Sequence, residues 1–241
     1  MNITGYTISK NPEHWHLPNI PWYNLAEDTE IPEIDKYKNA YKYQDWYSSL
    51  KYISYLADKR NRAIEKALSL HPETDAILCC DSYFLEQTEA LERLINDYRQ
   101  LSIECNLGGA VWGVTRARIS HLIRQRVEWF DKWGVPELRW MPPDFWPEKD
   151  WVAFRHRPPL SGLYRVHSLP GVYIFPRSTW EKGARCGITE DMHSCEHETL
   201  CEASGIPTYI DLNAKFWRRK VYPVMKCIRV SLNLGRLFQN F

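Results

Sequence analysis

Three short segments of the chain carry side chains that could act together in one reaction. The first is Asp81-Ser82-Tyr83, which follows the continuous apolar run from Ala76 to Cys80. Five apolar residues are too few for a helix, so the run predicts a strand buried on both faces, with Asp81 at its carboxyl end. A carboxylate there can bind a divalent cation or a ribose hydroxyl, and the alternative is that it caps the next turn.

The second segment contains Arg60 and lies just before that strand. Apolar residues recur at three- and four-residue steps and predict an amphipathic helix: Ile53, Leu56, Ala57, Ile64, Ala67 and Leu68. Arg60 falls within this apolar stripe. A guanidinium facing a core needs an anionic partner, and a bound diphosphate is one candidate. The alternative is a surface ion pair with Asp58 or Glu65.

The third segment is Glu196-His197-Glu198, within a predicted helical turn from Asp191 to Ala203. Glu196 and His197 can each accept a proton, and Glu198 can substitute for them. The alternative for Glu196 is an exposed helix acid. A separate hypothesis is a Zn²⁺ site, because His193, His197 and Cys201 follow one another at four-residue steps.

The elements that position these segments alternate between strand and helix. Strands are expected at 3–8, 76–80, 108–114, 171–175 and 206–210, with helices from Ile53 and across Leu91 to Leu101. This order predicts an α/β fold with a mainly parallel central sheet, flanked by helices, whose ligands bind beyond the carboxyl ends of the strands. Residues 11–47 show no clean period, and the Pro/Trp-rich stretch 136–159 predicts a loop or flap.

Two stretches resemble nucleotide-sugar glycosyltransferases of the GT-A fold. Asp58 to Leu68 followed by Thr74 to Tyr83 resembles the donor half, in which an Arg-Asn pair opens a helix that precedes a strand ending in Asp-X-Asp. Gly171 to Gly183 and Cys195 to Asp211 resemble the acceptor half, in which an acidic pair opens a helix. The resemblance implies one Rossmann-like GT-A domain over residues 1–241, with a donor half at 1–105 and an acceptor half at 106–241.

The resemblance also implies roles for individual residues. Arg60, Asn61, Asp81 and Tyr83 would contact the nucleotide-sugar donor, and Asp81 would hold Mn²⁺ or Mg²⁺. Glu196 would be the base of an inverting reaction, with His197 assisting, and it would lie across a crevice from Asp81 wide enough for the donor sugar.

The chain departs from the family pattern at three points. Tyr83 replaces the second acid of Asp-X-Asp, His197 replaces the second acid of the acceptor half, and no histidine follows His197. These departures leave the metal dependence open. The basic cluster from Lys215 to Lys220 could neutralise a departing diphosphate instead, and its alternative is a solvated surface run.

Composition limits the class of protein. With 31 basic and 30 acidic residues the net charge is +1, so no global field draws the chain to nucleic acid or a membrane. No stretch approaches a transmembrane span, seven cysteines lack regular spacing, and a cytoplasmic location is expected. The expected function is hexosyl transfer to an unknown hydroxyl acceptor, nucleic acid included. The alternatives are an inactive binding or structural protein of the same fold and a nucleotidyltransferase.

Overall fold

The computed structural model describes residues 1–9, 17, 19–26, 46–119, 122–129, 161–166, 169–188 and 196–221. The loop expected at 136–159 lies outside these residues. The helices are α2 (Trp46–Leu70), η1 (Ser82–Phe84), α3 (Thr88–Gln100), α5 (Arg177–Glu181) and α6 (Glu196–Ser204). The strands are β1 (Ile3–Ser9), β2 (Trp22–Ala26), β3 (Ala76–Cys80), β4 (Asn106–Ile119), β5 (Leu122–Trp129), β6 (Leu163–Arg165), β7 (Val172–Pro176) and β8 (Thr208–Val221).

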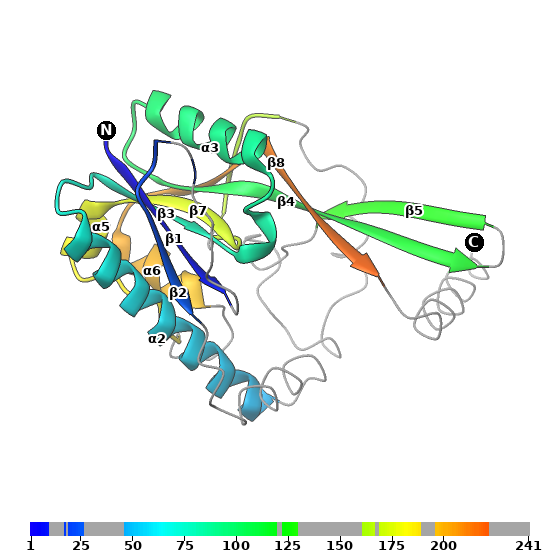
Figure 1. The fold of residues 1–241 in the computed structure, drawn as a ribbon, viewed down its shortest axis with the longest axis horizontal. Coiled ribbons are helices and arrows are strands. Elements are labelled where there is room, and N and C mark those ends of the chain that lie inside the picture. The colour runs from blue at the N-terminus through cyan, green and yellow to red at the C-terminus, as the bar shows by residue number, and fades with distance from the viewer. Residues whose placement is uncertain are drawn as a thin grey trace.

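These strands form one mixed sheet in the order β2-β1-β3-β7-β4-β8-β6, with β5 paired to β4 (Figure 1). The α/β class is confirmed, but the prediction of a mainly parallel sheet is not. Among the described strands three pairings are parallel and four are antiparallel. The prediction failed at β7, which lies between β3 and β4 and runs against both. Its apolar run indicates burial on both faces but carries no information on strand direction.

Helices cover both faces of the sheet, and two hydrophobic clusters hold them there. On one face α3 buries Leu91, Leu94, Ile95 and Tyr98. On the other face the core contains Ala57 and Ile64 of α2 and Leu200 of α6, packed on β3 and β7. Figure 1 shows α3 on one side of the sheet and α2 and α6 on the other. The three- and four-residue spacing seen in the sequence is the spacing of these buried faces.

Two adjacent glycines allow the middle of β4 to pack closely. A Cβ added at Gly109 would lie 2.2 Å from the Phe216 ring, and one at Gly108 would lie 2.4 Å from Pro170. Phe216 is fully buried and forms part of the core beneath α3. Only glycine lets a ring and a proline approach the backbone this closely, so the two residues fix where β8 and the loop before β7 pack.

Beyond the helices, β4 and β8 continue together and β5 joins them (Figure 1). Gln87, just before α3, pairs with the edge of β8 at the base of this extension. Its Oε1 accepts a hydrogen bond from the Trp217 N–H at 2.7 Å, and its Nε2 donates to the Trp217 carbonyl at 2.9 Å. A single amide side chain thus satisfies both groups of an edge residue. Within the described part of the chain, no helix has the length and apolar character that crossing a bilayer requires.

Candidate functional site

The three segments singled out in the sequence meet at one guanidinium. Arg60 lies in the middle of α2, Asp81 directly follows β3, and Glu196 is the first residue of α6. Arg60 Nε donates to Glu196 Oε1 at 2.9 Å, and Arg60 Nη2 donates to Asp81 Oδ1 at 3.1 Å. A residue of the predicted acceptor half and one of the predicted donor half therefore share one cation.

Burial distinguishes between the alternative interpretations of these residues. Arg60 and Glu196 are buried, whereas the Asp81 side chain keeps 23% of its surface exposed. The ion pairs of Arg60 are with Asp81 and Glu196, and it is Arg62 that pairs with Asp58. Asp81 makes no capping hydrogen bond with its side chain. The surface interpretations of Arg60 and Glu196, and the capping interpretation of Asp81, therefore do not describe this site.

The spacing between the two acids differs from the expectation. A gap wide enough for a sugar was predicted between Asp81 and Glu196, and a single guanidinium separates them instead. The sequence predicted correctly that Arg60 needs an anionic partner, but both partners that the structure places on it belong to the chain.

The charges of this cluster hold each other in the ionised state. Burial disfavours the Arg60 charge, yet Cys79, Asp81 and Glu196 together hold the pKa of Arg60 well above its ordinary value. Burial likewise would raise the pKa of Glu196, but the neighbouring His197 and the Arg60 guanidinium hold it below its ordinary value. At neutral pH Glu196 is a carboxylate and Arg60 a cation.

His197 is neutral and has a defined tautomer. Its Nδ1 lies 3.0 Å from the Leu169 carbonyl, which only accepts, so Nδ1 carries the proton. Nε2 is then an acceptor and lies 3.5 Å from Glu196 Oε1. Burial is the main cause that lowers the pKa of His197 to about 4. Two proton-accepting atoms, on adjacent residues, therefore face each other at the start of α6.

A row of polar side chains under Arg60 was missed in the sequence. Tyr6, Cys79 and Tyr173 are paired in register across β1, β3 and β7, and all three are buried. Arg60 Nη1 donates to Cys79 Sγ at 3.0 Å, and the two tyrosine hydroxyls lie 3.3 Å apart. Burial raises the pKa of Cys79 to about 11 and that of both tyrosines well above the ordinary value, so the row stays protonated. The available signal was Tyr173 within the otherwise apolar strand β7.

Asn61 is held by the chain itself. Its Nδ2 donates to the Cys186 carbonyl at 2.9 Å, and the Cys186 N–H donates to its Oδ1 at 3.0 Å. Both ends of the amide are thereby used to attach α2 to the segment after α5. The Tyr83 side chain and the whole of His193 lie outside the described residues, so the Tyr83 contact and the Zn²⁺ hypothesis have no geometry here.

No protein-family model and no curated protein matches the chain.

Asp81 is the described residue to which the resemblance assigns the metal ion. Among the residues that the structure describes, no group of three or more His, Cys, Asp or Glu side chains could hold an ion. Asp81 alone is a partly exposed carboxylate in the cluster. That donor set does not make an all-protein cage, but it suits Mg²⁺ or Mn²⁺ bound by one carboxylate together with substrate phosphates.

Proposed function

We propose that this chain is a glycosyltransferase of the GT-A class that uses a nucleotide-sugar donor, with Asp81 on the donor side and Glu196 with His197 on the acceptor side. One observation carries the proposal: Asp81 and Glu196, 115 positions apart, bind the same buried Arg60. Asp81 also stands where a strand ends, which is where open α/β sheets bind ligands.

The charge of the cluster indicates how a donor would bind. Arg60 carries one positive charge, Asp81 and Glu196 carry two negative charges, and His197 is neutral. The net charge of −1 disfavours a bare diphosphate. A divalent ion held by Asp81 would supply the missing positive charge and neutralise the diphosphate as it leaves.

Transfer itself requires a group that takes the proton of the acceptor hydroxyl. The bond between the sugar C1 and the diphosphate oxygen breaks, a bond from C1 to the acceptor oxygen forms, and the proton passes to the protein. Glu196 Oε1 and His197 Nε2 face each other and are both unprotonated at neutral pH, so one proton can be shared between them. Because the pKa of each residue is low, the pair, rather than either residue alone, accepts the proton in this proposal.

Calorimetry with UDP- and GDP-sugars, with and without Mn²⁺, tests the donor side. We expect binding that requires Mn²⁺ and is lost in Asp81→Ala. Asp58→Ala removes an exposed acid from the same helix as Arg60 and serves as the matched control. Unchanged affinity in Asp81→Ala, or binding without any metal, would remove the donor half of the proposal.

Hydrolysis of the bound donor by water tests the acceptor side, because it needs no identified acceptor. Glu196→Gln should lower turnover by about 10²-fold or more while leaving donor affinity nearly unchanged. Glu202→Gln changes an exposed acid of the same helix and should keep full turnover. Full turnover in Glu196→Gln together with loss in His197→Ala would assign the base to the histidine.

A second candidate is a binding protein of the same fold without catalysis. The burial of Glu196 and its ion pair with Arg60 favour it, because a base must reach its substrate. Such a protein binds a donor but shows no turnover, with or without Mn²⁺. Calorimetry and the hydrolysis assay together separate the two candidates.

A further inference from the structure

The extension formed by β4, β5 and β8 concentrates the positive charge of the chain. We call residues 112–119, 122–129 and 215–221 the arm. The arm contains eight basic residues and one acidic residue, Glu128. Removing them from the 31 basic and 30 acidic residues of the chain leaves 23 and 29. A chain that is nearly neutral overall therefore combines a basic arm with an acidic remainder.

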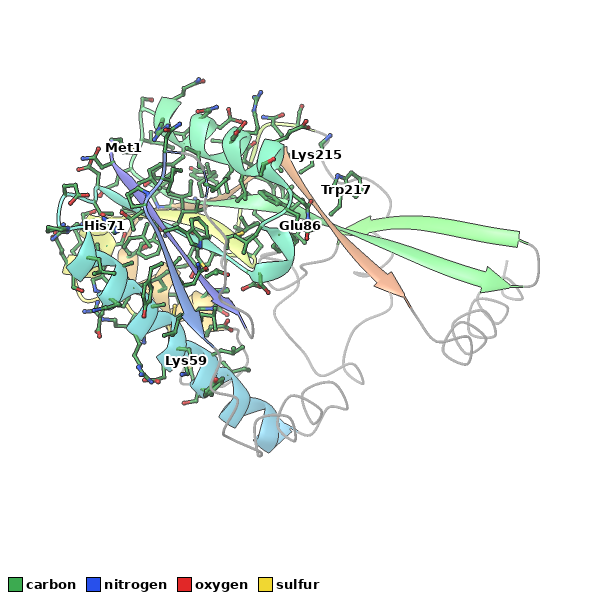
Figure 2. All side chains as sticks on the ribbon, viewed as in Figure 1. Met1, Lys59, His71, Glu86, Lys215 and Trp217 are labelled. Carbon is green, nitrogen blue, oxygen red and sulfur yellow. The ribbon has the colours of Figure 1, made fainter. Side chains whose placement is uncertain are left out.

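One face of the arm begins with a row of tryptophans. Trp112 of β4 is in register with Trp129 of β5 on one side and with Trp217 of β8 on the other. Residues directly opposite in neighbouring strands lie on the same face, so the three positions form one row across the arm. Trp217 is 44% exposed, and Figure 2 shows it with Lys215 where β8 leaves the helices.

Arginines follow the tryptophan row on the same face. Positions alternate between the two faces along a strand, so Arg116 and Arg118 occupy positions of the same face as Trp112. Arg219 of β8 lies two positions beyond Trp217 and shares it as well. Two residues along a strand span about 6.6 Å. Arg116 and Arg118 therefore follow Trp112 at increasing distance along β4, and Arg219 follows Trp217 along β8.

This face continues the one that carries the candidate site. Gly108 of β4 is in register with Tyr173, whose ring packs edge-on against His197 with 4.8 Å between ring centroids. Gly108 and Trp112 are four residues apart on β4 and so lie on one face. Because β4 runs parallel to β3, the arm also extends in the direction of the β3 end that Asp81 follows.

We propose that this face of the arm binds single-stranded nucleic acid, with bases stacked on the tryptophan row and phosphates bound by Arg116, Arg118 and Arg219. Aromatic side chains combined with a basic track are the usual means of binding single strands without reading sequence. Charge complementarity selects a polyanion, and the aromatic row selects one with exposed bases. The inference does not require sugar transfer, since nucleic-acid binding and donor binding are measured separately.

Fluorescence anisotropy of the full chain with a labelled 20-nucleotide oligo(dT), over a range of salt concentrations, tests the charges. The triple variant Arg116→Gln/Arg118→Gln/Arg219→Gln should weaken binding about 100-fold at 0.1 M salt and reduce the salt slope by about 2. The control Lys66→Gln/Arg99→Gln/Lys182→Gln makes the same charge change at exposed helix and turn positions of the remainder. It should bind nearly as the natural chain does.

Trp217→Ala tests the stacking and should weaken binding about 5- to 150-fold with an unchanged salt slope. Trp217→Phe keeps an aromatic ring and should restore most of the affinity, and circular dichroism checks that each variant is folded. Any of three results would overturn the proposal. They are tighter binding of a duplex than of the single strand, equal losses of affinity in the two triple variants, and equal binding of an uncharged polysaccharide. If the chain binds oligo(dT) but no nucleotide-sugar donor, the proposed function is overturned and the nucleic-acid proposal stands.

Discussion

Replacing Arg60 with methionine should be the most damaging single change at the site. Arg60 is 5% exposed and is the cation that Asp81 and Glu196 share. Without it, the Glu196 carboxylate remains buried with its charge uncompensated, whereas Asp81 keeps part of its hydration. Breaking a buried ion pair from one side costs about 3–5 kcal/mol, so we expect Arg60→Met to lower the free energy of unfolding by that amount at pH 7.

The pH dependence of this loss identifies its cause. In the natural chain the pKa of Glu196 is lower in the folded state than in the unfolded state, which stabilises the fold. This stabilisation is complete at pH values above the pKa of the unfolded state and is lost as the pH falls through the pKa of the folded state. Arg60→Met removes the guanidinium that lowers this pKa against the effect of burial, so the Glu196 pKa rises and the carboxylate takes up a proton more readily than in the natural chain. The difference in stability between the two proteins should therefore shrink as the pH falls from 7 to 5.

Urea unfolding followed by circular dichroism measures both effects. The double variant Arg60→Met/Glu196→Gln carries no buried carboxylate at position 196 and should be more stable at pH 7 than Arg60→Met alone. If Arg60→Met is too unstable to measure, Arg60→Lys can replace it. Lysine keeps the positive charge but cannot donate to both acids with one planar group, so we expect the free energy of unfolding to fall by about 1–3 kcal/mol. A loss below about 1 kcal/mol for Arg60→Met, independent of pH, would refute the ion-pair account.

Three further changes test other contacts. The pKa of His197 is about 4 in the folded chain and about 6.5 in the unfolded chain. The free energy of unfolding should therefore fall by about 3 kcal/mol as the pH drops from 6.5 to 4, and His197→Gln should abolish that part of the pH profile in urea unfolding. Asn61→Ala removes both hydrogen bonds to the Cys186 backbone and should cost about 1–3 kcal/mol in urea unfolding, while donor affinity measured by calorimetry stays unchanged. Gly109→Ala should cost about 1–3 kcal/mol by thermal unfolding, and Phe216→Leu in the same chain should recover part of it, because the added Cβ meets that ring.

The sequence predicts elements well where burial alone decides them. The apolar run of β3 and the inner face of α3 appear as expected, since both patterns record which side chains leave water. β2 was not predicted, because Trp22 to Ala26 shows no alternation that separates it from its surroundings. The place of β7 between β3 and β4 could not be predicted either, since strand order depends on pairings between residues far apart in sequence.

The charged residues of the candidate site were singled out in the sequence, but the ion pairs between them were not predicted. Arg60 in an apolar stripe indicated a buried charge that needs an anion, and the anions proved to be Asp81 and Glu196. A sequence cannot tell whether a buried charge is neutralised by the chain or by a ligand. Asn61 illustrates the same limit, because an amide suited to a donor is equally suited to the Cys186 backbone.

The position of β7 affects how the chain can fold during synthesis. β3 pairs with β1, which is made earlier, but its other edge pairs with β7, whose last residue lies 96 positions after Cys80. At about 5–20 residues per second, a ribosome needs about 5–20 s to make that stretch. During this time an apolar strand edge has no partner from its own sheet, and it can pair with another nascent chain. We expect fragments that stop before residue 171 to aggregate during translation unless a chaperone covers that edge.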